Sequence, residues 1–161
     1  GDQFFVGMDP ENVRRFLAVD LPRDQAHAAL VSDLDRVVAA ARTDPMTMAG
    51  SMKVPDADMA VLRQTASSYA RNFLEALRQG YWGFIDDFSA NARDWGFDPR
   101  QAKAPLIIEY GVHDVNVPAG HGRWLAENIP GAEVIVNQEG GHRSLPEKIF
   151  ERLKILAEAD R

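Results

Sequence analysis

Two short apolar segments near the C-terminus limit most strongly what this chain can fold into. Residues 105–111 form a nearly unbroken apolar run that ends in glycine, and residues 132–136 form a second run that Gly140 and Gly141 interrupt. Runs of this kind are typical of parallel strands that are buried on both faces. A helix is expected between them, from about Pro118 to Asn128. A strand, a helix and a second strand in this order predict one right-handed βαβ unit.

The chain before Pro99 has no convincing strand pattern, and its apolar residues recur at helical spacing. Asp9-Pro10 and Asp44-Pro45 each combine a capping residue with a first-turn proline, so both predict helix starts. The sequence therefore predicts an α/β protein with two regions. Residues 1–98 form a helical, cap-like half, and residues 99–161 form a βαβα unit whose last helix reaches the C-terminus. The expected helices of the first half start at Asp9-Pro10, span about 22–42, run from Asp44-Pro45 to Gly80, and span about 81–94.

Two parallel strands do not make a stable sheet by themselves, because parallel sheets are normally larger and covered on both faces. We therefore expect the 105–111 and 132–136 strands to be the C-terminal end of a larger sheet whose earlier strands lie outside this chain. An uncovered strand edge recruits another chain. The isolated chain is accordingly expected to self-associate, as a two-fold dimer.

Composition narrows the partners and the compartment. The formal net charge is −6 and the basic residues are scattered, which argues against a nucleic-acid partner. No apolar run approaches the roughly 20 residues of a membrane span. The sequence contains no cysteine, and its first residues have neither the basic start nor the apolar stretch of a signal peptide. These features favour a cytoplasmic protein.

Two loops carry the residues of chemical interest. Asp114 lies in the 111–118 loop after the first strand, and His142 lies in the 140–144 loop after the second. Loops at the carboxyl ends of parallel strands share one edge of the sheet, where ligands bind in open α/β folds. An aspartate and a later histidine at that edge are suited to general-base chemistry. The histidine would accept and return a proton, and the aspartate would fix its tautomer and stabilise the imidazolium.

The motifs around these residues resemble those of the α/β-hydrolase superfamily, in which the acid also precedes the histidine. The resemblance lies in residues 105–146 and consists of a G-x-x-D-x-x-V-P loop, a Leu-Ala-x-x-Ile-Pro-Gly-Ala stretch and a Gly-His pair, matched by Gly111, Asp114, Val117, Pro118, residues 125–132, Gly141 and His142. It implies that Asp114 and His142 are the last two members of a catalytic triad. It also implies that the strands are the seventh and eighth of the hydrolase sheet, and that the helical half is the cap inserted after the sixth.

The remaining candidates are weaker. His113 stands on the opposite side of an extended loop from Asp114, and His27 and His121 are expected to be solvated. Ser144 and Glu147 form an S-x-x-E capping box for the last helix. Asp86 and Asp87 are expected on a solvated helix face or in a structural hydrogen bond. The sequence has none of the spacings of a metal site, so neither a metal nor another cofactor is expected.

The family's nucleophile is absent from this sequence. The nucleophile elbow has the form G-x-S-x-G, and Ser51 follows only one glycine, in a region expected to be helical. The resemblance thus implies the C-terminal part of a hydrolase of the EC 3 class, acting on an ester, amide or related bond of a small organic substrate. Carboxylesterases and proline iminopeptidases are the nearest comparisons. The nucleophile would come from the missing N-terminal half, and the isolated chain would be inactive.

Two alternatives stay open at this point. Haloalkane dehalogenases and epoxide hydrolases have the same fold with an aspartate nucleophile, and Asp114 and His142 would look the same in them. The other alternative is a non-catalytic module that uses the fold only for binding.

Overall fold

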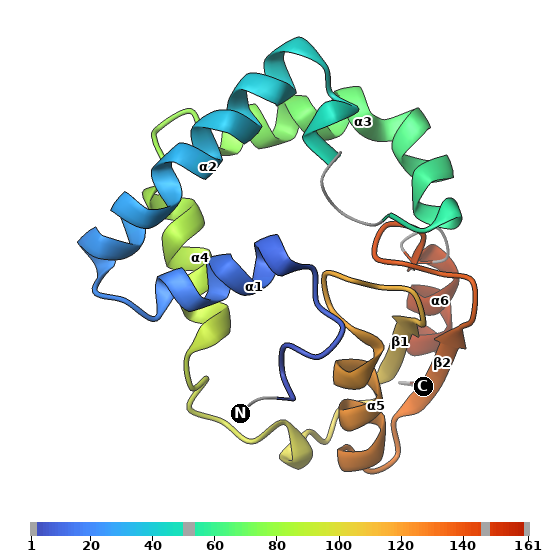
Figure 1. The fold of residues 1–161 in the computed structure, drawn as a ribbon. Coiled ribbons are helices and arrows are strands. Elements are labelled where there is room, and N and C mark those ends of the chain that lie inside the picture. The colour runs from blue at the N-terminus through green and yellow to red at the C-terminus, as the bar shows by residue number, and fades with distance from the viewer. Residues whose placement is uncertain (1–2, 50–53, 146–148, 160–161) are drawn as a thin grey trace. The chain divides into compact units, whose positions relative to one another are not determined.

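The computed structural model describes residues 3–49, 54–145 and 149–159. Its described residues combine six α-helices with a two-stranded parallel sheet, so the mixed α/β character predicted from the sequence is confirmed at this level (Figure 1). They divide into two compact units. The α/β unit comprises residues 3–9, 54–61, 97–145 and 149–159, and the helical unit comprises residues 10–49 and 62–96.

The α/β unit is built on the strands β1 (Ile107–Gly111) and β2 (Glu133–Asn137), which pair in parallel with Ile107 opposite Glu133 and Gly111 opposite Asn137. Helix α5 (Ala119–Asn128) makes the crossover between them. Its Gly122 faces the ring of Tyr110 on β1. The strands and the crossover helix predicted from the sequence are therefore confirmed, with bounds that differ by one or two residues.

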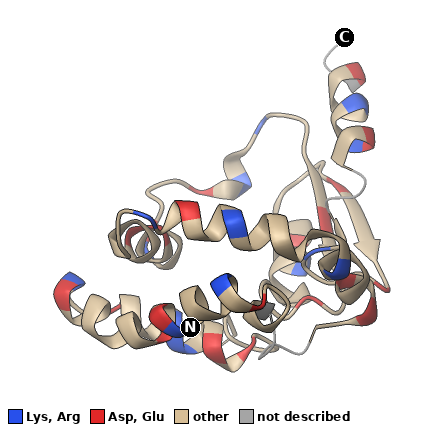
Figure 2. Ribbon diagram, turned by 90° about the horizontal axis from the view of Figure 1, so that it is seen from above, with Lys and Arg blue, Asp and Glu red and all other residues tan. Residues whose placement is uncertain are grey.

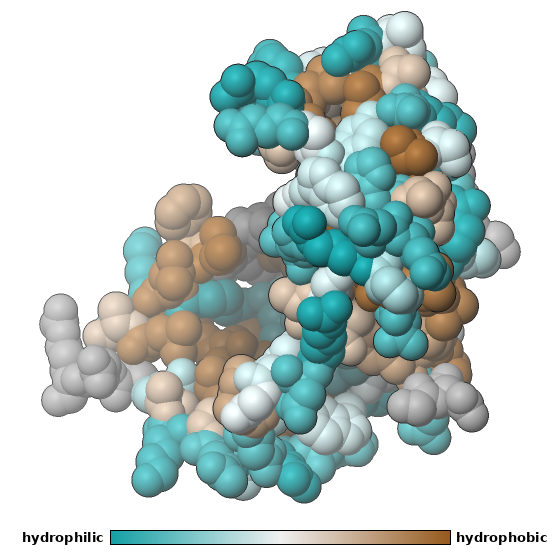
Figure 3. Space-filling model, turned by 90° about the vertical axis from the view of Figure 1, so that its left-hand side faces the viewer, coloured by the Kyte–Doolittle hydropathy of each residue, from teal (hydrophilic) through white to brown (hydrophobic). Residues whose placement is uncertain are grey.

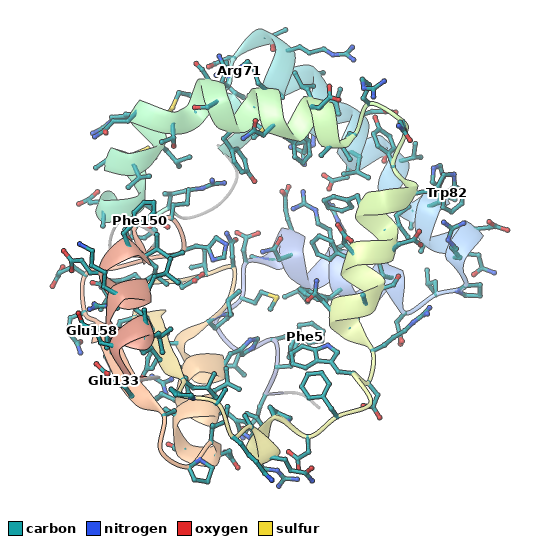
Figure 4. The ribbon with its side chains drawn as sticks, turned by 180° about the vertical axis from the view of Figure 1, so that it is seen from behind. Phe5, Arg71, Trp82, Glu133, Phe150 and Glu158 are labelled. Atoms are coloured by element: carbon teal, nitrogen blue, oxygen red, sulfur yellow. The ribbon has the colours of Figure 1, made fainter. Side chains whose placement is uncertain are left out.

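Helix α6 (Ile149–Ala159) follows β2 and lies on the other side of the sheet from α5 (Figures 1 and 4). Its Arg152 donates from Nε to Glu109 of β1 at 3.2 Å. Glu109 and Tyr110 are consecutive strand residues, which point to opposite faces. Much of α6 is uncovered: Phe150, labelled in Figure 4, has 76% of its surface exposed.

The two strands are less buried than their apolar sequences predict. Four of the five β1 residues are half-buried and only Gly111 is buried, while β2 alternates between exposed and half-buried positions. Burial on both faces, which is typical of such strands in a complete sheet, is therefore not reached in this chain. Among the described residues each strand has only the other as its partner, so one edge of each is unpaired.

The helical unit contains α1 (Pro10–Val19), α2 (Arg23–Thr43), the part of α3 (Asp56–Ala76) from Leu62 onward, and α4 (Trp82–Ala92). The predicted apolar spacing appears here as a core between α1, α2 and α4. Phe73 of α3 and the half-buried aromatic residues of α4 pack against that core, whose buried members are Ala18, Val19, Ala26, Leu30, Leu34 and Ile85. Burial of apolar side chains such as these is the main force that stabilises the unit.

The predicted helix start at Asp44-Pro45 is wrong. Asp44 is the C-terminal cap of α2, and its carboxylate accepts hydrogen bonds from the backbone of Met46 and the hydroxyl of Thr47. These bonds close a turn that leads into a short 3-10 helix (Thr47–Ala49), and α3 begins later, at Asp56. Asp44-Pro45 is therefore a local turn signal, since aspartate side chains readily bond the backbone two residues on.

The surface carries charges of both signs. Figure 2 shows Lys and Arg interspersed with Asp and Glu along the helices. On the face that Figure 3 displays, hydrophobic residues lie between hydrophilic ones. None of the helices in the described ranges combines the length and the apolar character needed to cross a bilayer.

Candidate functional site

The loops that follow β1 and β2 continue side by side beyond the sheet. Val112 donates its backbone N–H to Asn137 at 3.0 Å, and His113 donates to Gly140 at 3.0 Å. This approach requires glycine at position 111, because a β-carbon there would lie 2.4 Å from the Gly140 carbonyl oxygen. The ends of the two parallel strands thus bring the 111–118 and 140–144 loops together.

This arrangement places Asp114 and His142 in direct contact. Nδ1 of His142 lies 3.0 Å from Oδ2 of Asp114, so the contact predicted from the order of the strands is confirmed. When the Asp114 carboxylate is ionised it can only accept, so this contact then requires the hydrogen on Nδ1. That tautomer leaves the lone pair on Nε2. The His142 side chain is 44% exposed, whereas that of Asp114 is 3% exposed.

The second oxygen of Asp114 is held by its own loop. Oδ1 accepts the backbone N–H groups of Asn116 and Val117, each at 2.8 Å. The carboxylate therefore accepts one bond from the imidazole and two from the backbone. Such a carboxylate is oriented before any ligand arrives, which is the property needed in a group that orients a histidine.

A second carboxylate, Asp58, holds the backbone of the histidine loop. It lies in the first turn of α3 and is 3% exposed. Oδ2 accepts the N–H of His142 at 2.7 Å, and Oδ1 accepts the N–H groups of Arg143 at 3.0 Å and Ser144 at 2.9 Å. The sequence analysis missed this residue, because an acid in a first helical turn is ordinarily explained by the helix dipole.

An open hollow of about 850 Å³ lies beside Asp114 within the α/β unit. Its walls come from the 112–115 loop, from the N-terminal segment and from α5, which contributes Arg123, Trp124 and Glu127. His113 also lines it. This hollow offers both apolar and charged groups next to the buried carboxylate.

The structure assigns other places to the remaining histidines. His121, predicted to be solvated, has Nε2 2.7 Å from the carbonyl oxygen of Phe4, and its ring lies tilted by 31° against the Phe4 ring, so it fastens the N-terminal segment to α5. His27, in the helical unit, stacks on Trp82 with ring centroids 4.3 Å apart. Both imidazoles lie beside aromatic rings and are half-buried, so each is partly solvated.

Ser144 bonds both to Asp58 and to its own loop. Its hydroxyl donates to Oδ1 of Asp58 at 2.9 Å and accepts the backbone N–H of Gly141 at 3.0 Å. Glu147, the other half of the predicted capping box, lies outside the described residues. The same holds for Ser51, the residue nearest in pattern to a nucleophile elbow.

Asp86 and Asp87 are exposed residues of α4. Asp86 binds Arg23 through both carboxylate oxygens, each at 2.9 Å. The Arg23 hydrogen bonds hold the pKa of the Asp86 carboxyl below its usual range. The prediction of a structural hydrogen bond is thus confirmed for Asp86.

No group of three or more histidine or acidic side chains within the described ranges is arranged to hold a metal ion. Chemically, the site offers an imidazole whose side chain is 44% exposed, a buried carboxylate in contact with its Nδ1, and a second carboxylate that holds its backbone. It can accept and return a proton at Nε2.

Comparison with known proteins finds no match among protein-family models, curated proteins or solved structures. The resemblance to α/β-hydrolases therefore stays a prediction from the sequence motifs.

Proposed function

We propose that this chain carries the acid and the base of an α/β-hydrolase triad, with Asp114 as the acid and His142 as the base. The observation that supports this best is the 3.0 Å contact between Nδ1 of His142 and Asp114, made by loops that follow two adjacent parallel strands. In that superfamily the acid and the histidine occupy the same relative positions and the same order in the chain.

The fold proposed for the whole protein follows from this assignment. The β1–α5–β2–α6 order is that of the C-terminal end of a hydrolase sheet, and the helical unit takes the place of the cap. The free edge of β1 is where earlier strands would pair. The partner that completes the sheet is therefore the N-terminal half of the same protein, which would also supply the nucleophile and the oxyanion hole.

The proposed reaction uses Nε2 of His142. This atom takes the proton from the hydroxyl or thiol of the nucleophile as the nucleophile attacks a carbonyl carbon, and it then returns the proton to the leaving group. Asp114 keeps Nδ1–H pointed at its carboxylate and stabilises the imidazolium formed in between. The substrate class is an ester, amide or related bond of a small organic molecule, and the chemistry needs no cofactor. The cytoplasmic location stays a prediction from composition.

The experiment joins the chain to the N-terminal half encoded with it and measures hydrolysis of p-nitrophenyl acetate. His142→Ala and Asp114→Asn should each lower kcat by about three orders of magnitude or more, since loss of either residue removes the base or its tautomer. His113→Ala is the matched control, because it changes a neighbouring imidazole without touching the pair. Unchanged kcat in both triad variants would disprove the assignment.

A further inference from the structure

The Asp58 carboxylate is the most completely bonded buried acid of the described site. It accepts three backbone N–H groups, from His142, Arg143 and Ser144, and also the Ser144 hydroxyl at 2.9 Å. A buried charge is costly unless it is hydrogen-bonded, and hydrogen bonds to a carboxylate are stronger than those between neutral groups. Four donors from one short loop therefore couple the position of that loop to the position of Asp58.

The contacts of Gly141 show how closely the histidine loop and the start of α3 approach each other. A β-carbon on this residue would lie 2.4 Å from Oδ2 of Asp58 and 2.5 Å from Cγ of Pro55. Neither atom can yield easily, because Pro55 is rigid and Asp58 is fixed by its four donors. The glycine before His142 is therefore required by the start of α3, which lies against the loop at this point.

His142 is consequently held at two points by two different carboxylates. Asp114 binds its ring at Nδ1, and Asp58 binds its backbone N–H at 2.7 Å. The ring contact fixes the rotation of the imidazole, whereas the backbone contact fixes where the imidazole is attached. A half-exposed histidine on a loop depends on both, since a displacement of the backbone carries Nδ1 out of reach of Asp114.

We propose that Asp58 is a positioning residue for His142, acting through the 141–144 backbone to keep the imidazole on Asp114. For catalysis this rests on the proposed triad, but the positioning itself is a property of this chain. It assigns the first turn of α3 a part in the site that no motif of the sequence indicates. Asp58 itself does not touch the reacting atoms.

The test uses the whole 161-residue chain uniformly labelled with nitrogen-15, and it observes the His142 ring and the backbone amides by NMR. The contact with Asp114 imposes the Nδ1–H tautomer, and the hydrogen-bonded Nδ1 proton reports it. Asp58→Asn replaces one accepting carboxylate oxygen with an amide NH2 group that can only donate, so this signal should be lost. Asp56→Asn is the matched control, because Asp56 is an exposed acid in the same helical turn; it should keep the signal.

The amide signals of Tyr110 and Gly122 show whether the variant is still folded around β1 and α5. A folded Asp58→Asn variant that keeps the His142 Nδ1 proton would overturn the proposal. If Asp58→Asn also shifts the amide signals of Tyr110 and Gly122, the same NMR measurement is made on Gly141→Ala. This variant keeps the Asp58 carboxylate and only forces the histidine loop away from it. Loss of the Nδ1 signal in Gly141→Ala supports the proposal, and retention overturns it.

This readout needs no hydrolysis, so it separates the two proposals. A Nδ1 proton that depends on Asp58, in a joined protein whose activity does not depend on His142, would reject the triad and keep the positioning role. If the activity depends on His142 but the Nδ1 proton signal is unchanged in Asp58→Asn, the triad is kept and the positioning role is rejected.

Discussion

Gly122 of α5 lies against Tyr110 of β1 so closely that a β-carbon on Gly122 would come within 2.4 Å of the ring. The loop that carries Asp114 joins these two elements. The closeness of the helix to the strand therefore determines where that loop starts and ends, and through it the position of the carboxylate.

Gly122→Ala is expected to destabilise the chain by about 1 to 3 kcal/mol, the usual cost of adding a methyl group to a closely packed contact. Gly120→Ala is the control on the same helix, because nothing lies within 4 Å of its added β-carbon. That change should be neutral or stabilise by up to about 1 kcal/mol, since alanine favours a helix over glycine. Urea denaturation measures both. Equal effects would show that the contact with Tyr110 is not tight.

Asp33 should make the stability of the helical unit depend on pH. Its side chain is 6% exposed, and its carboxylate binds Arg15, Arg36 and Arg14. Burial alone would raise the pKa of Asp33, but the hydrogen bonds and charges of the arginines outweigh it, so the pKa lies below the ordinary value. Because the folded state favours the ionised carboxylate, Asp33 adds to the free energy of unfolding at pH values above its unfolded pKa of about 4. This contribution is lost as the pH falls through the lower pKa of the folded state.

Asp33→Asn should therefore destabilise the chain at neutral pH by about 1.5 to 3 kcal/mol, the range for hydrogen bonds to a charged group. The difference from the unmodified chain should shrink below about pH 4. Asp20→Asn, which changes an exposed acid, should alter stability by less than about 0.5 kcal/mol at either pH. A difference for Asp33→Asn that grows on acidification would contradict the prediction.

The isolated chain should not hydrolyse p-nitrophenyl acetate faster than its His142→Ala variant. A positioned imidazole without a nucleophile or an oxyanion hole supplies only weak general-base catalysis. Initial rates at micromolar protein measure this. Turnover that requires His142, together with a covalent adduct on Ser51 or Ser144, would contradict it.

The isolated chain should also self-associate at micromolar concentration. The described sheet has unpaired edges, and α6 leaves Ile149, Phe150 and Leu153 between 50% and 76% exposed. Apolar surface of this kind marks an interface or a tendency to associate. Sedimentation should show a dimer that Phe150→Glu weakens and that Lys154→Glu, at an exposed polar position of the same helix, leaves intact. A monomer at all concentrations would count against this prediction.

The sequence was sufficient to predict the parts of the site that depend on local pattern and strand order. The runs around Ile107 and Val134 are recognisable as strands because they are short, apolar and bounded by glycine or proline. Once the strands are parallel neighbours, the loops after them must meet, and the Asp114–His142 contact follows.

The contacts of Asp58 could not be predicted in this way. Asp58 and His142 are 84 positions apart, and the acid belongs to a helix whose spacing carries no information about its partner. The bond from the Ser144 hydroxyl to Asp58 is likewise not indicated by the sequence context of Ser144, which predicts a helix cap. The burial of β1 and β2 was overestimated because apolar residues indicate how much surface a strand could bury. The described residues cover only part of that surface.

The division of α3 between the two units has a consequence for anyone who would exchange parts of this protein. Residues 56–61 of the helix belong to the α/β unit, although the rest belongs to the helical unit. A chimera that replaced everything from Pro10 to Gly96 would discard Asp58 with the helices and leave three backbone N–H groups of the histidine loop without their acceptor. A graft that resumes after Val61 keeps it. A chimera that keeps the histidine loop intact therefore needs its junction inside helix α3. Secondary structure alone would place the junction in a loop between helices.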